Sequence, residues 1–124
     1  MTDYRIELVL VPVTDPDRSR AFYGDTLGWP VDHDVTVSED VRFVQVTPPG
    51  SACSIAFGRG ISEMVPGALR ALQCVVDSAD DVLADLQARG VDCEGVQDLA
   101  WGRFVTFADP DGNTWTAQEL PTRP

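Results

Sequence analysis

The chain has 124 residues, enough for one domain with a hydrophobic core, and its 44% hydrophobic content is that of a globular protein. It carries 20 acidic and 9 basic residues, which gives a formal net charge of −11. Because nucleic-acid binding depends on Lys and Arg displacing counterions from phosphates, this charge argues against a nucleic-acid partner. It favours a cationic small ligand, although solubility alone also explains an acidic surface.

The cysteines and the longest apolar run exclude two further classes of protein. Cys53, Cys74 and Cys93 are odd in number and form no close pair, so they predict neither a disulfide framework nor a zinc knuckle. The run at residues 8–13 is far too short to span a bilayer, and no signal-peptide pattern precedes it. We therefore expect a cytoplasmic protein with no membrane partner.

In chain order, the first half predicts one strand, one helix and three further strands. The apolar residues 6–13 read as a largely buried strand that stops at Thr14-Asp15-Pro16. Thr14 or Asp15 can cap the helix that follows, Pro16 suits its first turn, and Gly28 ends it. The expected helix covers residues 16–26, and the expected strands cover residues 29–37, 41–47 and 52–57.

The second half repeats this order after a glycine-rich segment. Residues 69–76 predict a strand and residues 79–89 a helix that Gly90 ends. Strands are expected at residues 91–96, 104–107 and 114–118, with the Asp109-Pro-Asp-Gly112 turn between the last two.

One β-α-β-β-β unit used twice predicts an α+β fold in a single domain, residues 1–124. Repeat one covers about residues 4–58, the linker about residues 59–67, and repeat two about residues 68–120. Such a unit leaves one sheet face bare, so two units can form a shared cleft while the helices cover the outer faces.

Two motif groups carry a resemblance to a known family. The first is Val11-Pro-Val-Thr-Asp15, continued by Leu27-Gly-Trp29, and the second is Phe107-Ala-Asp-Pro-Asp-Gly-Asn113, closed by residues 115–119. With this spacing the chain resembles the vicinal-oxygen-chelate superfamily, the glyoxalase/bleomycin-resistance/dioxygenase family. The resemblance runs over nearly the whole chain, and it implies a homodimer, because the family commonly completes its clefts with paired modules.

The resemblance also implies where a metal would bind, and the residues there are unsuitable. Metal enzymes of this family use His, Gln and Glu at four cleft positions. These positions correspond here to Leu8, one of Ser54, Ile55 and Ala56, then Ala71, and finally Thr116. Leu and Ala have no donor atom, and Thr is a poor ligand. We therefore predict no metal and no cofactor.

Other carboxylates and the only histidine do not restore a metal site. Side chains alternate along a strand, so Glu7 and Glu119 should face away from the cleft that holds Leu8 and Thr116. A one-residue slip in register would reverse these faces. His33 lies between two aspartates and is expected on the surface.

The same alternation selects the residues that should line the cleft. They give an apolar floor with neutral hydrogen-bonding groups, which suits a ligand with planar or apolar parts. Gln73 either bonds its neighbours or orients a ligand, and Trp101 either stacks on a ligand or packs against a second subunit. The predicted ligand-binding residues are Leu8, Leu10, Gln73, Trp101, Phe104, Thr116 and Gln118.

Three functions are compatible with this site. The first is a metal-independent protein that binds and sequesters an antibiotic or another aromatic or cationic metabolite, as in the bleomycin-resistance branch of the resembled family. The second is a metal-free glyoxalase-like enzyme, a lyase, isomerase or dioxygenase that acts on a small organic substrate. The third is a metal enzyme with atypical ligands. No catalytic residue stands out, since no ionisable group is expected in the cleft. We favour the first.

Overall fold

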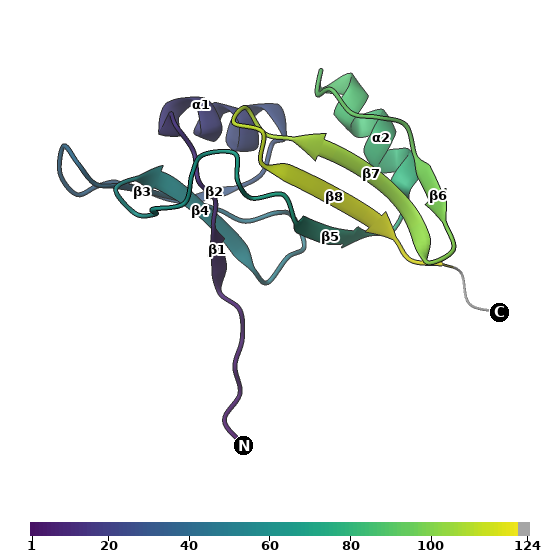
Figure 1. Ribbon diagram of the computed structural model, residues 1–124, viewed down its shortest axis with the longest axis horizontal. Coiled ribbons are helices and arrows are strands. Elements are labelled where there is room, and N and C mark those ends of the chain that lie inside the picture. Colours follow the sequence, from purple (N-terminus) through teal and green to yellow (C-terminus); the bar gives the residue numbers. More distant parts are fainter. Residues whose placement is uncertain (122–124) are drawn as a thin grey trace.

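The structure is a computed structural model that describes residues 1–121, and it consists of two sheets, each with its own helical segment (Figure 1). The first repeat contains β1 (Leu8–Leu10), α1 (Pro16–Arg20), the π-helix η1 (Ala21–Thr26), β2 (Val31–Thr36), β3 (Arg42–Val46) and β4 (Ser54–Arg59). The second contains β5 (Leu72–Val76), α2 (Ala79–Ala88), β6 (Gln97–Leu99), β7 (Gly102–Ala108) and β8 (Thr114–Glu119).

Both sheets have the same strand order, which confirms the duplicated βαβββ unit. The orders are β1-β4-β3-β2 and β5-β8-β7-β6. In each sheet the first two strands in this order are parallel and the remaining neighbours are antiparallel. Because β1 and β5 each stand first in the order of their sheet, both are edge strands. Within residues 1–121 no helix has the length and apolar character needed to cross a membrane.

The helices begin where the sequence predicts. The Asp15 carboxylate accepts hydrogen bonds from two backbone N–H groups of α1, and Ser78 caps α2 in the same way. The predicted helix over residues 16–26 forms, but its second half is π-helical, so the Leu27 N–H donates to the Phe22 carbonyl at 2.9 Å. Gly24 lies in this wider turn, where an added Cβ would come within 3.0 Å of Val31 Cγ2.

Three predicted strands differ from the structure. Two are shorter than expected, because only Leu8–Leu10 of residues 6–13 is assigned to β1 and only Leu72–Val76 of residues 69–76 to β5. The strand predicted at residues 91–96 is wrong, since only Cys93 forms an isolated bridge, with Phe107, and β6 lies later at Gln97–Leu99. The apolar side chains in residues 91–96 that suggested a strand pack against the core instead.

Aromatic side chains from both repeats meet in the core. Tyr23 of η1 is fully buried, and its ring stacks on Phe57 of β4 with centroids 5.5 Å apart. On the other side it contacts Trp115 of β8 at 6.0 Å, and Trp29 packs edge-on against Trp115 at 5.1 Å. One hydrophobic core therefore joins the two repeats.

A buried hydrogen-bond network lies beside these rings. Asp109 is buried, and its carboxylate accepts from the Tyr23 hydroxyl at 2.8 Å, from the Asn113 amide at 2.9 Å, and from the Asp111 and Asn113 backbone N–H groups. The Asn113 amide also donates to the Pro12 carbonyl at 2.8 Å, and the Trp115 indole donates to the Tyr23 hydroxyl at 3.0 Å. These bonds connect η1 and the segment that follows β1 to the turn between β7 and β8.

This environment also controls the ionisation of Tyr23. Burial first, and then the Asp109 carboxylate, raise the pKa of the Tyr23 hydroxyl well above its usual range. A tyrosine in the unfolded chain ionises at about pH 10, while Tyr23 in the fold stays protonated. The stability that this group contributes is therefore complete below about pH 10 and falls as the pH rises above it.

We expect Tyr23→Phe to lower the free energy of unfolding by about 2 to 3 kcal/mol, because it removes a donor from a buried carboxylate and leaves the Trp115 indole without its acceptor. Urea unfolding measures the change. Tyr4→Phe is the matched control, since Tyr4 is 93% exposed and should cost nothing measurable. Equal effects of the two substitutions would contradict the proposed importance of the network.

Candidate functional site

The face of the second sheet that points away from α2 carries a row of neutral polar groups. Residues paired across neighbouring strands point to the same side, and Gln73 pairs with Thr116, which pairs with Thr106. The Gln73 amide donates to Gln118 Oε1 at 2.7 Å, and the two Thr hydroxyls lie 3.2 Å apart. We call this surface, made by Gln73, Val75, Phe104, Thr106, Thr116 and Gln118, the open face.

Trp101 lies at one end of the open face, in the turn between β6 and β7. Its side chain is 61% exposed, while its backbone is held because the Gln118 amide donates to the Trp101 carbonyl at 2.9 Å. Gly102 permits this contact, since a Cβ there would lie 2.9 Å from Gln118 Nε2 and its φ of +154° is rarely adopted by other residues. The turn therefore presents an indole to solvent on a fixed backbone.

The first sheet has a corresponding face, and its register settles which residues of β4 belong to it. Leu8 pairs with Ser54 and Leu10 with Ala56, so these four side chains point to the same side. Ile55 points to the other side and is buried in the core. Leu8 and Leu10 thus lie where the alternation of β1 predicts, on a different sheet from the other predicted ligand-binding residues.

The positions that would hold a metal are on these two faces and lack suitable donors. Leu8 has none, and the Ser54 hydroxyl beside it is buried and lies 2.7 Å from the Thr47 hydroxyl. Thr116 offers only the hydroxyl already shared with Thr106. Within residues 1–121, no three His, Cys, Asp or Glu side chains come together as a metal site. The donor set does not fit a divalent metal of the kind that polarises a substrate oxygen.

Glu7 and Glu119, the two carboxylates next to lost metal positions, lie where the alternation of side chains along a strand predicts. Glu119 points to the helix side, where it accepts a hydrogen bond at 2.8 Å from the Ala79 N–H at the start of α2. Glu7 and His33 are exposed. None of these groups joins the open face, which therefore has no general acid or base of its own.

Two predicted site residues differ from expectation in their burial. Gln73 was expected inside an apolar strand, but its side chain is exposed and bonds another side chain, Gln118, instead of the backbone. Phe104 was expected on the cleft surface, yet it is buried, so its ring offers little contact area. Trp101 is thus the principal exposed aromatic group of the predicted set.

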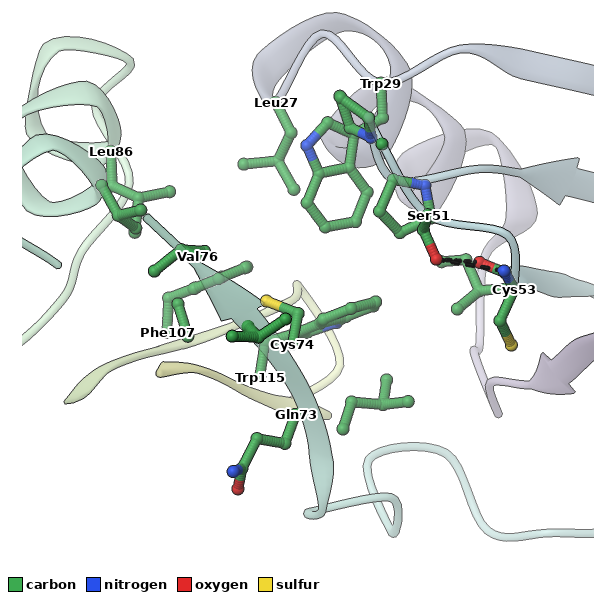
Figure 2. Close-up of a pocket in the computed structure, with 18 of the residues that line it drawn as sticks. Leu27, Trp29, Ser51, Cys53, Gln73, Cys74, Val76, Leu86, Phe107 and Trp115 are labelled. Carbon is green, nitrogen blue, oxygen red and sulfur yellow. Dashed lines mark hydrogen bonds between the residues drawn. The ribbon is translucent and has the colours of Figure 1, made fainter. Parts of the chain in front are cut away.

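A cavity of about 580 Å³ lies between the two repeats, largely on the helix side of the second sheet (Figure 2). Figure 2 shows Leu27 and Trp29 on one side of it, Leu86 of α2 on another, and the strand β5 with Cys74 between them. Of the predicted ligand-binding residues only Gln73 lines it. Its lining also includes Val75 of the open face, and Cys53, Val76, Asp81, Asp85, Phe107 and Trp115.

Sequence reasoning missed this cavity because its walls come from distant segments. They include the end of η1, the β3–β4 loop, β5, α2, β7 and β8. The individual residues read as ordinary core positions. Cys74 of β5 is partly buried, and this burial raises the pKa of its thiol.

Comparison with known protein families identifies the family that has this architecture. The model of the glyoxalase/bleomycin resistance protein/dioxygenase superfamily matches residues 5–117. The chain belongs to this superfamily. The resemblance carried by the sequence motifs is thereby confirmed, together with the two-repeat fold.

Among solved structures, the chain is similar to TnmS3, described as an antibiotic binding protein from Streptomyces sp. CB03234, with 34% identity, 98% and 99% coverage of the two chains, and a TM-score of 0.87. It is also similar to a glyoxalase/bleomycin resistance protein from the same organism, with 35% identity, 92% and 99% coverage, and a TM-score of 0.79. A curated relative, the uncharacterized protein YetH of Bacillus subtilis (strain 168), is 24% identical, with 93% and 98% coverage.

We expect Zn²⁺, Ni²⁺, Mn²⁺ and Fe²⁺ to leave the melting temperature of the purified protein unchanged, because a ligand that does not bind the native state cannot stabilise it. Elemental analysis should find no stoichiometric metal. Bound metal with a clear rise in melting temperature would contradict this prediction, and Glu7→Gln and Glu119→Gln would then identify the ligands.

Proposed function

We propose that this protein is a cytoplasmic, metal-independent small-molecule-binding protein that sequesters an antibiotic or another aromatic or cationic metabolite. The observation that carries the proposal is Trp101, a solvent-exposed indole on a fixed turn at the end of a neutral, hydrogen-bonding sheet face. An indole so placed offers a planar ligand a stacking surface. Gln73, Thr116 and Gln118 offer it directional polar contacts.

Charge supports the cationic part of the proposal. The chain's net charge of −11 attracts cations over distances of about a Debye length. The open face itself bears no charged side chain, so a bound cation meets no buried positive charge there. Aromatic faces also bind cations directly, with Trp the strongest of them.

The relatives support the same class of function. TnmS3 is described as binding an antibiotic, and it covers 98% of this chain at 34% identity. The superfamily name itself includes bleomycin resistance. Because one fold hosts several chemistries, these likenesses favour small-molecule binding without naming the ligand.

A second copy of the chain would complete the site. Tyr4 and Ile6 are 93% and 73% exposed and alternate in phase with Leu8 of β1, so the segment before Glu7 continues the edge strand with exposed apolar side chains. Val75 on the open face is also exposed. We propose a homodimer in which the first-sheet face with Leu8 and Leu10 contributes to a cleft over the open face of the partner.

Size-exclusion chromatography with light scattering is expected to give twice the 13.5 kDa chain mass at micromolar concentration. Burial of the exposed apolar edge provides the driving force, so Ile6→Asp should shift the protein toward the monomer. Val65→Asp, which changes an exposed residue of the linker, is the control and should leave the mass unchanged. A monomeric parent protein would contradict the homodimer.

Binding is tested with doxorubicin, which combines fused aromatic rings with a protonated amine. We expect Trp101→Ala to weaken its affinity about tenfold, because the substitution removes a stacking surface. Fluorescence titration measures this change, and Val65→Ala, an exposed apolar residue in the linker, is the control. Unchanged affinity would contradict the proposed site.

Two other outcomes would point to the alternatives. If Trp101→Ala alters the oligomeric mass and not the affinity, the indole packs against a second subunit. If mass spectrometry shows that the bound compound is converted and released, the protein is a metal-free enzyme and not a sequestering protein. Recovery of the compound unchanged is the expected result.

A further inference from the structure

Of the six residues that form the open face, only Gln73 and Val75 of β5 also line the cavity between the repeats. The cavity lies along β5, an edge strand that pairs only with β8, and its apolar walls lie toward α2. Cys74 and Val76 of β5 enter these walls, together with Trp115 and Phe107 from the same side of the sheet. Trp101, Thr116 and Gln118 are not among the lining residues.

The size and lining of the cavity suit a small planar molecule. Its volume of about 580 Å³ lies within the range of ligand sites. The rings of Trp29 and Phe107 and the side chains of Leu27 and Leu86 provide apolar contact (Figure 2). Because the outer edge of β5 has no strand partner, its free backbone N–H and C=O groups can bond polar atoms on a ligand's rim.

The charged groups at the cavity select the sign of the ligand. Among residues 1–121, no Lys, Arg or His lines it, while two carboxylates on one face of α2, Asp81 and Asp85, do. Asp85 is already paired with Arg89 at 3.0 Å. Asp81 forms no ion pair within residues 1–121, so its charge is available to a bound cation.

We propose that this cavity is a second small-molecule site, which binds a planar aromatic amine in its protonated form, with the rings among the apolar walls and the ammonium group toward Asp81. The site goes beyond the proposed function, because its apolar walls and Asp81 lie outside the open face, with which it shares Gln73 and Val75 of β5. A protein with both sites holds two ligands per chain.

The three cysteines provide the direct test. Cys53 and Cys74 line the cavity and Cys93 does not, and all three are free thiols of intermediate exposure. The probe is 9-aminoacridine, a planar aromatic amine that is protonated at neutral pH. The full-length protein is alkylated with iodoacetamide at pH 8.5, with and without the probe, and modification of each cysteine is followed by mass spectrometry.

We expect the probe to slow alkylation of Cys53 and Cys74 at least threefold and to leave Cys93 unchanged. Asp81→Asn should weaken probe affinity about threefold to fivefold, as for an exposed ion pair, while Asp92→Asn should have no effect. Trp101→Ala should leave protection of the cavity cysteines intact. A loss of doxorubicin binding in Trp101→Ala therefore reports on the open face alone.

Two results would overturn the second site. If Cys74 is as reactive with the probe bound as without it, the probe binds elsewhere. If Cys74 is inert in the probe-free protein but reacts after unfolding, a segment of the second subunit already fills the cavity. Neither result bears on Trp101, so the proposed function of the open face stands or fails separately.

Discussion

The fold depends on one buried carboxylate. Within residues 1–121 Asp109 forms no ion pair, and its carboxylate is satisfied by hydrogen bonds, one of which comes from Tyr23 in the other repeat. Burying a charge without such partners would cost several kcal/mol. The arrangement of the repeats that satisfies Asp109 is therefore strongly preferred. It also sets the spacing of Trp29 and Trp115, and with it the cavity between the repeats.

Because the core holds the scaffold in place, the two faces of the second sheet can differ in chemistry. On the helix side of the second sheet, Trp115 and Ala117 are core residues, while Glu119 and Arg103 bond to the start of α2. On the opposite side, Gln73 is exposed and Thr116 is half-buried. Gln73 forms a hydrogen bond with Gln118, and Thr116 forms one with Thr106. Under the proposed function, the positions that the family resemblance assigns to metal ligands contact the bound small molecule directly.

Much of this was predictable from local patterns, and the failures have a common cause. Caps such as Asp15 and turns such as Asp109 to Gly112 are short-range features, so the element order followed from the sequence. The strand β6 did not, because Gln97–Leu99 has no apolar alternation and is defined by pairing with β7. The burial of Phe104 and the cavity likewise depend on contacts between distant segments.

The most direct test of ligand binding on the open face uses the three tryptophan indoles, whose N–H signals are resolved by ¹⁵N–¹H correlation NMR. On titration with doxorubicin, the Trp101 signal should shift. The Trp29 and Trp115 indoles line the cavity between the repeats, so a shift of their signals reports binding at the second site and not on the open face. A shift of Trp29 or Trp115 without Trp101, or no shift at all, would contradict ligand binding on the open face.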